Sequence, residues 1–208
     1  MVSLSPAWAD VVSNFDLDAQ GWTGITADLP GYTMGAVYAP TYVPAGYITI
    51  TDPNSSDTFF RAPAAYRGNL LQYRGGTLSW LTFSDYAPNY IGPLVVLKGA
   101  GMTLVYTPTT QLSSTSFTPL SVTLAPGTNW AHAGGGAISV AQFNTVLGSV
   151  DELWLNAETY FGVVETVAID DVLLHSVLPV GVPEPVELSL LALSVAGAGL
   201  ARWRRVRV

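Results

Sequence analysis

Two pairs of aspartates near opposite ends of the chain could together bind a hard metal ion. Asp16 and Asp18 follow the first strand-like segment, and Asp170 and Asp171 lie in the last one. If these two strands lie side by side, the carboxylates meet, and Ca²⁺ prefers six to eight such oxygen ligands. The pattern predicts a structural Ca²⁺ site, with Asp16 and Asp170 as the first ligands. The alternative is two solvated turns whose aspartates accept hydrogen bonds from local backbone N–H groups.

Tyrosine-rich segments favour a second kind of binding. Tyr42 belongs to one Pro/Gly-rich stretch that holds several tyrosines, and Tyr86 and Tyr90 lie in another. Flat aromatic rings stack on the C–H faces of sugars, so exposed rings here predict a carbohydrate site. The alternative is that these rings cover the core of the domain. Both interpretations remain open from the sequence.

No motif of catalysis is present. The chain has no cysteine, which excludes a thiol nucleophile and a thiolate metal site. It contains neither Gly-x-Ser-x-Gly nor His-Glu-x-x-His, and its two histidines, His132 and His175, share no ligand spacing. A formal net charge of −7 makes nucleic acid a poor partner, because binding to phosphates requires lysines and arginines. We therefore predict a non-enzymatic protein that does not bind nucleic acid.

Short β-branched and aromatic runs alternate with Gly, Pro, Asn and Ser clusters, a pattern typical of all-β domains. Gly99–Gly101 predicts a tight hairpin. Ser139 and Gln142 form the capping box of one short helix, with Gly148 as its stop. This pattern predicts a mainly β antiparallel sandwich with one helix and with Trp22 and Trp80 in the core. The expected strands cover residues 11–15, 47–51, 59–62, 77–83, 94–98, 102–107, 117–124, 152–155 and 167–174.

The C-terminal segment has the composition of a membrane signal. Pro183 and Pro185 favour an extended peptide, and residues 188–201 form an apolar run without charge. Such a run spans roughly 21 Å as a helix, and snorkelling arginines and bilayer thinning can cover the shortfall to ~30 Å. Four of the eight basic residues occupy the last seven positions, which places this end in the cytoplasm. The alternative is a C-terminal core helix. The predicted anchor consists of Leu188, Leu190, Leu191, Leu193, Leu200, Arg202, Arg204 and Arg205.

This order of elements resembles the PEP-CTERM sorting signal of Gram-negative bacteria. The sorting motif is Val182, Pro183, Glu184 and Pro185. The resemblance implies recognition by an exosortase, anchoring in the inner membrane before processing, and delivery to the cell surface or exopolysaccharide matrix. Residues 7–9, Ala-Trp-Ala, are similar to a signal-peptidase site. We therefore expect residues 1–9 to be the remnant of a signal peptide whose start lies upstream, with coincidence as the alternative.

Eight segments in the body of the chain carry a second resemblance. In order, they are residues 13–16, 21–23, 75–80, 94–99, 102–106, 127–130, 139–147 and 169–174. Taken together, this ordered set resembles the laminin B domain, also called laminin IV type A. The resemblance implies a jelly-roll sandwich related to galactose-binding and carbohydrate-binding modules, and it brings no catalytic residues. We expect this domain at residues 10–175, a linker at 176–181 and the sorting signal at 182–208. The expected function is non-catalytic binding of exopolysaccharide, and the alternative is a structural or adhesive surface protein that binds other proteins.

Overall fold

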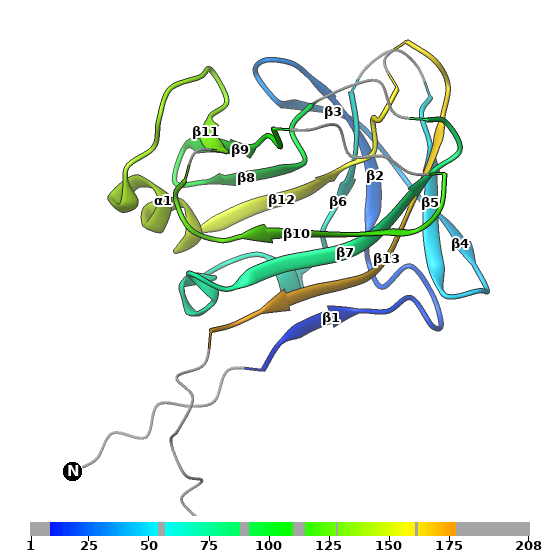
Figure 1. The fold of residues 1–208 in the computed structure, drawn as a ribbon, viewed down its shortest axis with the longest axis horizontal. Helices are drawn as coiled ribbons and strands as arrows, with labels where there is room; N and C mark the ends of the chain where they lie inside the picture. The colour runs from blue at the N-terminus through cyan, green and yellow to red at the C-terminus, as the bar shows by residue number, and fades with distance from the viewer. Residues whose placement is uncertain are drawn as a thin grey trace, which may run out of the picture. The chain divides into compact units, whose positions relative to one another are not determined.

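The structure is a computed structural model that describes residues 9–53, 57–87, 92–109, 115–127, 129–160 and 162–177. Two antiparallel sheets contain all the strands of these residues (Figure 1). The strands are β1 (Val11–Ser13), β2 (Thr23–Asp28), β3 (Thr33–Tyr38), β4 (Thr41–Val43), β5 (Tyr47–Thr51), β6 (Asp57–Arg61), β7 (Thr77–Ser84), β8 (Val95–Gly99), β9 (Met102–Tyr106), β10 (Thr118–Thr123), β11 (Trp130–His132), β12 (Val150–Asn156) and β13 (Thr166–His175). The helices are α1 (Val140–Leu147) and the short 3-10 turns η1 (Ala64–Tyr66) and η2 (Leu71–Tyr73).

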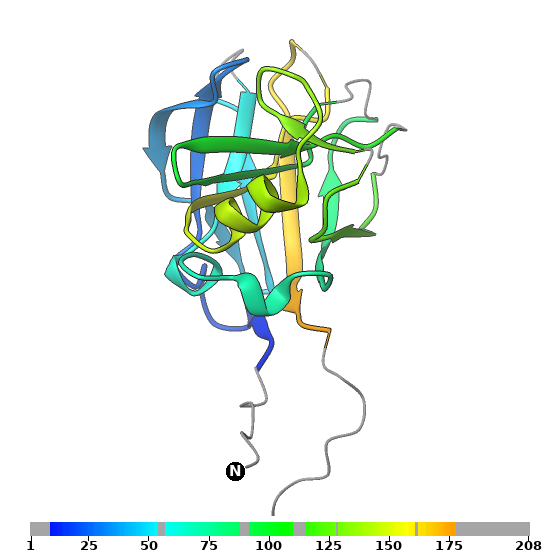
Figure 2. The ribbon, with the colours of Figure 1, turned by 90° about the vertical axis from the view of Figure 1, so that its left-hand side faces the viewer.

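The two sheets are built from strands that are distant in sequence. Sheet A has the order β10-β7-β13-β5-β4, and β1 also pairs with β13. Sheet B has the order β11-β9-β8-β12-β6-β2-β3. Figure 2 shows the sheets side by side, with α1 across one end of the space between them. The predicted antiparallel sandwich is therefore confirmed.

Alternation of side chains along the strands forms the core between the sheets. In β5, Ile48 and Ile50 are buried, while Tyr47 and Thr49 point to the outer face. Along β7 the same period of two buries Leu78 and Trp80. α1 adds buried Phe143, Val146 and Leu147 to this core.

The first and last strands are joined through aromatic residues. Trp22, only 1% exposed, packs edge-on against Phe15 and Tyr66 and donates a hydrogen bond to Ser13 Oγ at 3.1 Å. The Tyr66 hydroxyl donates to the carbonyl of Val172 at 2.8 Å, next to the position where Ser13 and Val172 pair. The prediction of Trp22 as a core residue is thus confirmed, as is Trp80, which is 2% exposed.

Local signals predicted the helix and the hairpin well. Ser139 and Gln142 form the expected capping box, and the helix ends at Leu147. Gly148 is the C-cap that ends the helix, as predicted, and it has a right-handed φ of −73°. β8 and β9 are joined through Ala100 and Gly101, both with positive φ, as in a type I′ turn.

The sequence analysis did not predict four of the strands, namely β2, β3, β4 and β11. β2 and β3 contain glycine, which weakens the strand signal, while β4 and β11 have three residues each. The sorting motif and the membrane anchor lie outside the described residues. So does the expected signal-peptide remnant, except for its last residue, Ala9. Within the part of the chain that the structure describes, no helix has the length and apolarity needed to cross a bilayer.

Candidate functional site

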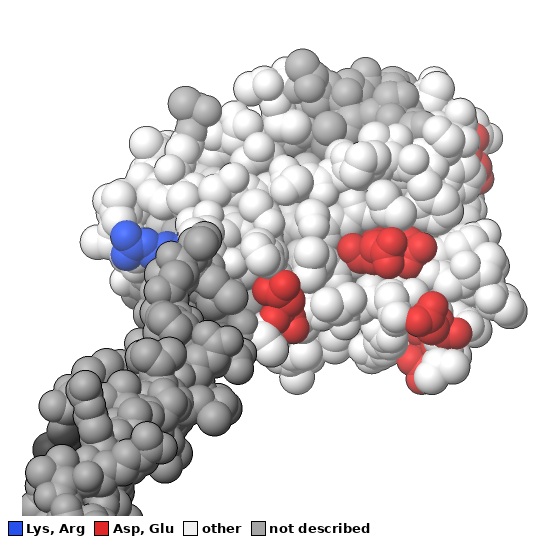
Figure 3. Space-filling view, turned by 60° about the horizontal axis from the view of Figure 1, so that its bottom comes forward, with Lys and Arg blue, Asp and Glu red and all other residues white. Residues whose placement is uncertain are grey.

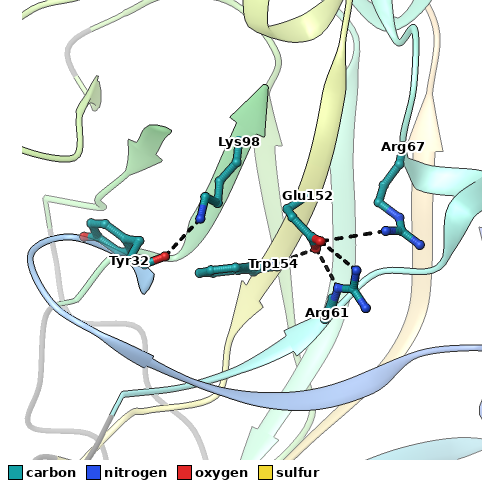
Figure 4. Close-up of polar contacts among 6 residues, drawn as sticks. All are labelled: Tyr32, Arg61, Arg67, Lys98, Glu152 and Trp154. Carbon is teal, nitrogen blue, oxygen red and sulfur yellow. Dashed lines mark hydrogen bonds and ion pairs between the residues drawn. The ribbon is translucent and has the colours of Figure 1, made fainter. Parts of the chain in front are cut away.

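The outer face of sheet B is covered by its own apolar cluster. Tyr32, in the turn between β2 and β3, is 6% exposed and belongs to this cluster. Lys98 donates a hydrogen bond from Nζ to the Tyr32 carbonyl at 3.1 Å and lies 5.0 Å from the centre of the Trp154 ring (Figure 4). These contacts hold the turn between β2 and β3 against the outer face of sheet B. The buried members of the cluster are Ile25, Ala27, Tyr32, Phe59, Val96, Val105 and Trp154.

Beside this cluster, an ion pair joins β6 to β12. Arg61 donates two hydrogen bonds of 2.6 Å to the Glu152 carboxylate, and the Trp154 ring N–H donates a third at 3.1 Å (Figure 4). Burial alone would raise the pKa of Glu152, but the bonds from Arg61 and Trp154 and the charges of Arg61 and Arg67 outweigh it and lower the pKa. Because these cations already compensate the carboxylate, we interpret the group as structural.

The outer face of sheet A carries three aromatic rings that face solvent in part. Tyr47 comes from β5, Phe83 from β7, and Phe117 precedes β10. The centre of the Phe117 ring lies 5.3 Å from that of Tyr47 and 5.9 Å from that of Phe83. Phe117 is 39% exposed, and the other two are half-buried. We call Tyr47, Phe83 and Phe117 the ring cluster.

A small residue on the strand between them lets the rings meet. Ala168 of β13 pairs with Phe83 on one side and with Thr49 on the other. Its neighbours Val167 and Ile169 belong to the core, so Ala168 points to the outer face. Ala168 is nevertheless fully buried, which is consistent with rings covering it. The site therefore depends on strand register, and the sequence analysis did not identify Phe83 or Phe117.

The tyrosines of the predicted carbohydrate site differ in exposure and in contacts. Tyr86 is 44% exposed, and its ring centre lies 5.7 Å from that of Tyr160, which forms a second aromatic pair beyond the end of β7. Tyr42 is half-buried against the core, and its hydroxyl donates to the carbonyl of Asp16 at 2.9 Å. Tyr90 lies outside the described residues. Of the two that the structure describes, Tyr86 is the one with an exposed ring.

The predicted calcium ligands Asp16 and Asp170 are near each other because β1 pairs with β13. Burial, followed by the charges of Asp171 and Asp16, raises the pKa of Asp170. Acidic side chains are seen on the face of the molecule that carries β1 and β13 (Figure 3). Among the described residues, no three His, Asp or Glu side chains are grouped so that they could hold a metal ion. Calcium binding at these aspartates remains a prediction.

The alternative of capped turns accounts for part of this region. Asp18 accepts a hydrogen bond from the Gln20 backbone N–H at 2.7 Å. Asp170 accepts one from the Asp171 N–H at 2.7 Å. Asp171 has a φ of +47° and lies where the register of β13 shifts against β7. Both interactions are the local caps that aspartates make in turns.

Three buried carboxylic acids at one end of the sandwich were missed entirely. Asp52, Glu158 and Glu165 are 3%, 5% and 1% exposed. In sequence they flank ordinary loop residues, so no local signal distinguishes them from solvated acids. Only the packing of the segment after β5 against the connection between β12 and β13 buries them.

The fold defines a two-sheet β-sandwich module, and the comparisons with known proteins place it in a family. The family model for Laminin B (Domain IV) matches residues 59–187, more than half of the chain. The chain therefore belongs to the laminin B family, and membership indicates an extracellular, non-catalytic module. A search of the curated proteins found no match.

A solved structure supports the fold independently. The L4b domain of human laminin alpha-2 is similar, with a TM-score of 0.62 and 13% sequence identity. The similarity covers 81% of this chain and 97% of that domain. At this level of identity, it shows the architecture alone.

Proposed function

We propose that this chain is an exported surface module that binds exopolysaccharide through the ring cluster. The ring cluster is the observation that carries the proposal, since sugars present C–H faces that stack on aromatic rings. Hydroxyl groups border it on the same sheet, including the Thr51–Thr166 pair at 3.0 Å. The net charge of −7 favours neutral over acidic polysaccharides.

Replacing Phe117 by alanine is expected to weaken glycan binding about tenfold, or ~1.4 kcal/mol. Phe117 contacts both other rings, so its loss opens the middle of the surface. Neutral oligosaccharides that raise the melting temperature of residues 10–177 would be chosen from an array, and affinities measured by isothermal titration calorimetry. Tyr86→Ala tests whether the second aromatic pair contributes.

Val140→Ala is the matched control for this experiment. Val140 is 54% exposed at the start of α1, outside sheet A, so its truncation should leave both affinity and melting temperature unchanged. Equal glycan affinity of Phe117→Ala and the wild-type protein would exclude the ring cluster as the site. Absence of any glycan that raises the melting temperature would exclude the activity.

We propose further that residues 182–208 direct the chain through the inner membrane to an exosortase. This segment lies outside the described residues, and its sequence supports the proposal. Pro185→Ala, within the motif, should leave the protein in the inner-membrane fraction instead of at the surface. Immunoblots of fractionated Gram-negative cells that express an exosortase measure this distribution. Ser189→Ala, in the apolar run, is the control, and identical distributions of wild type and Pro185→Ala would contradict the proposal.

One observation favours the alternative of a protein partner. β3 is the last strand of sheet B in the described residues, and Met34 and Val37 on it are 39% and 51% exposed. An edge strand with exposed apolar residues can accept an added strand from another protein. Binding of a protein that Val37→Asp abolishes, together with failure of every glycan, would support this second function.

A further inference from the structure

The buried acids at one end of the sandwich have unequal surroundings. We call Asp52, Glu158 and Glu165 the acid cluster. Asp57, the first residue of β6, lies near it and is half-buried. The ion pairs of Glu152 with Arg61 and of Asp10 with His175 lie in other parts of the fold.

Glu165 and Asp52 are compensated by hydrogen bonds. The Glu165 carboxylate accepts from the backbone N–H groups of Thr159 and Tyr160 and from the hydroxyls of Thr159 and Ser84. Asp52 accepts from the Thr58 hydroxyl at 3.0 Å, and its backbone N–H donates to the Glu165 carbonyl at 2.8 Å. Donors to a carboxylate favour its charged form.

Glu158 has the opposite surroundings. Its Oε2 atom is buried and has no hydrogen-bond partner among the described residues. The charges that reach it are those of Asp52, Glu165 and Asp57, all negative. Burial, followed by these three charges, raises the pKa of Glu158 to about 8. A neutral carboxylic acid can occupy this position, whereas a carboxylate there would be an uncompensated buried charge.

We propose that Glu158 is a proton-binding site that holds the connection between β12 and β13 in place. When the proton leaves, the charge is expected to move toward water and loosen the connection, of which residues 157–160 and 162–165 are described. That connection carries Tyr160, the ring partner of Tyr86. The proton would thereby control the aromatic surface at this end of the sandwich. The inference is independent of glycan binding.

The sign of the pH dependence follows from the two states. In the unfolded chain, a glutamate ionises near its ordinary pKa of about 4.5, and in the fold Glu158 keeps its proton up to about pH 8. Between these values the folded state holds one proton more, so stability falls as pH rises. The nearby hydroxyl of Tyr38, whose pKa burial raises to about 12, stays neutral throughout. Tyr32, whose pKa is raised by burial and then by the charge of Asp57, also stays neutral.

Glu158→Gln tests the proposal because the amide matches the shape of the neutral acid and cannot ionise. The melting temperature of residues 10–177, pretreated with EDTA, would be measured by circular dichroism from pH 5.5 to 8.5. The wild-type value should fall across this range by about 5–10 °C relative to the variant. Asp151→Asn, at an exposed carboxylate, is the control and should keep the wild-type slope.

Three further measurements make the outcome decisive. Carbon NMR of the Glu158 carboxyl in the wild-type protein should show a midpoint near pH 8, and a midpoint near 4.5 would overturn the proposal. Equal pH slopes for the wild type and Glu158→Gln would also overturn it. A rise in wild-type melting temperature on adding 1 mM Ca²⁺ at pH 8, lost in Glu158→Gln, would show that a cation, and not a proton, compensates the cluster. Faster amide exchange at residues 157–160 above pH 8, after correction for intrinsic rates, would support the proposal that the Glu158 proton holds this connection in place.

Discussion

Replacing Glu165 by alanine is expected to lower the free energy of unfolding by roughly 4 kcal/mol. Glu165 is 1% exposed and accepts four hydrogen bonds that join the connection after β12 to the end of β7. Without it, two backbone N–H groups and two hydroxyls lose their acceptor in a site that water enters poorly. Each buried donor left unsatisfied costs about 1–3 kcal/mol, and relaxation of the loop recovers part of this.

Urea denaturation at pH 6 measures this effect while Glu158 is neutral. Glu165→Gln is the informative companion, because it keeps the side-chain volume but replaces one acceptor oxygen by an NH₂ group that faces donors. The free energy of unfolding of Glu165→Gln should lie between those of the wild-type protein and Glu165→Ala. If both variants unfold within about 1 kcal/mol of the wild-type protein, the four hydrogen bonds are not a main support of this end of the sandwich.

Gly99→Ala should lower the free energy of unfolding by roughly 3 kcal/mol. A Cβ atom at Gly99 would lie 2.1 Å from the carbonyl oxygen of Ser149 and 2.9 Å from that of Val146. Both are backbone atoms where α1 leads into β12, so no side-chain rotation can relieve the overlap. The end of β8 must move away from β12, with which Gly99 pairs through Val150.

Gly134→Ala provides the matched control, since no atom lies within 4 Å of a Cβ at that position and its φ is outside the left-handed region. This control should change stability by at most about 0.5 kcal/mol in the same urea experiment. Similar urea midpoints for Gly99→Ala and Gly134→Ala would mean that β8 and the α1–β12 turn can move apart without lowering the free energy of unfolding. The contrast isolates close backbone approach from the general effect of adding a methyl group.

Sequence reasoning succeeded where one short segment contains the whole signal. The capping box of Ser139 and Gln142 and the two-residue turn at Ala100–Gly101 involve neighbours in the chain. The regular alternation in β7 likewise shows its buried face without knowledge of its partners. β4 and β11, in contrast, are strands only because β5 and β9 supply their hydrogen bonds.

The sequence by itself determined the class of fold and the core tryptophans, because these depend on residue types and on period-two patterns. Only the tertiary structure decided the sites. The Phe117 ring meets those of Tyr47 and Phe83, which come from β5 and β7 on either side of small Ala168 in β13. Glu158 becomes a proton-binding candidate because packing removes water from it and brings other carboxylates near. Register and desolvation arise between segments far apart in the chain, so no local pattern could have shown them.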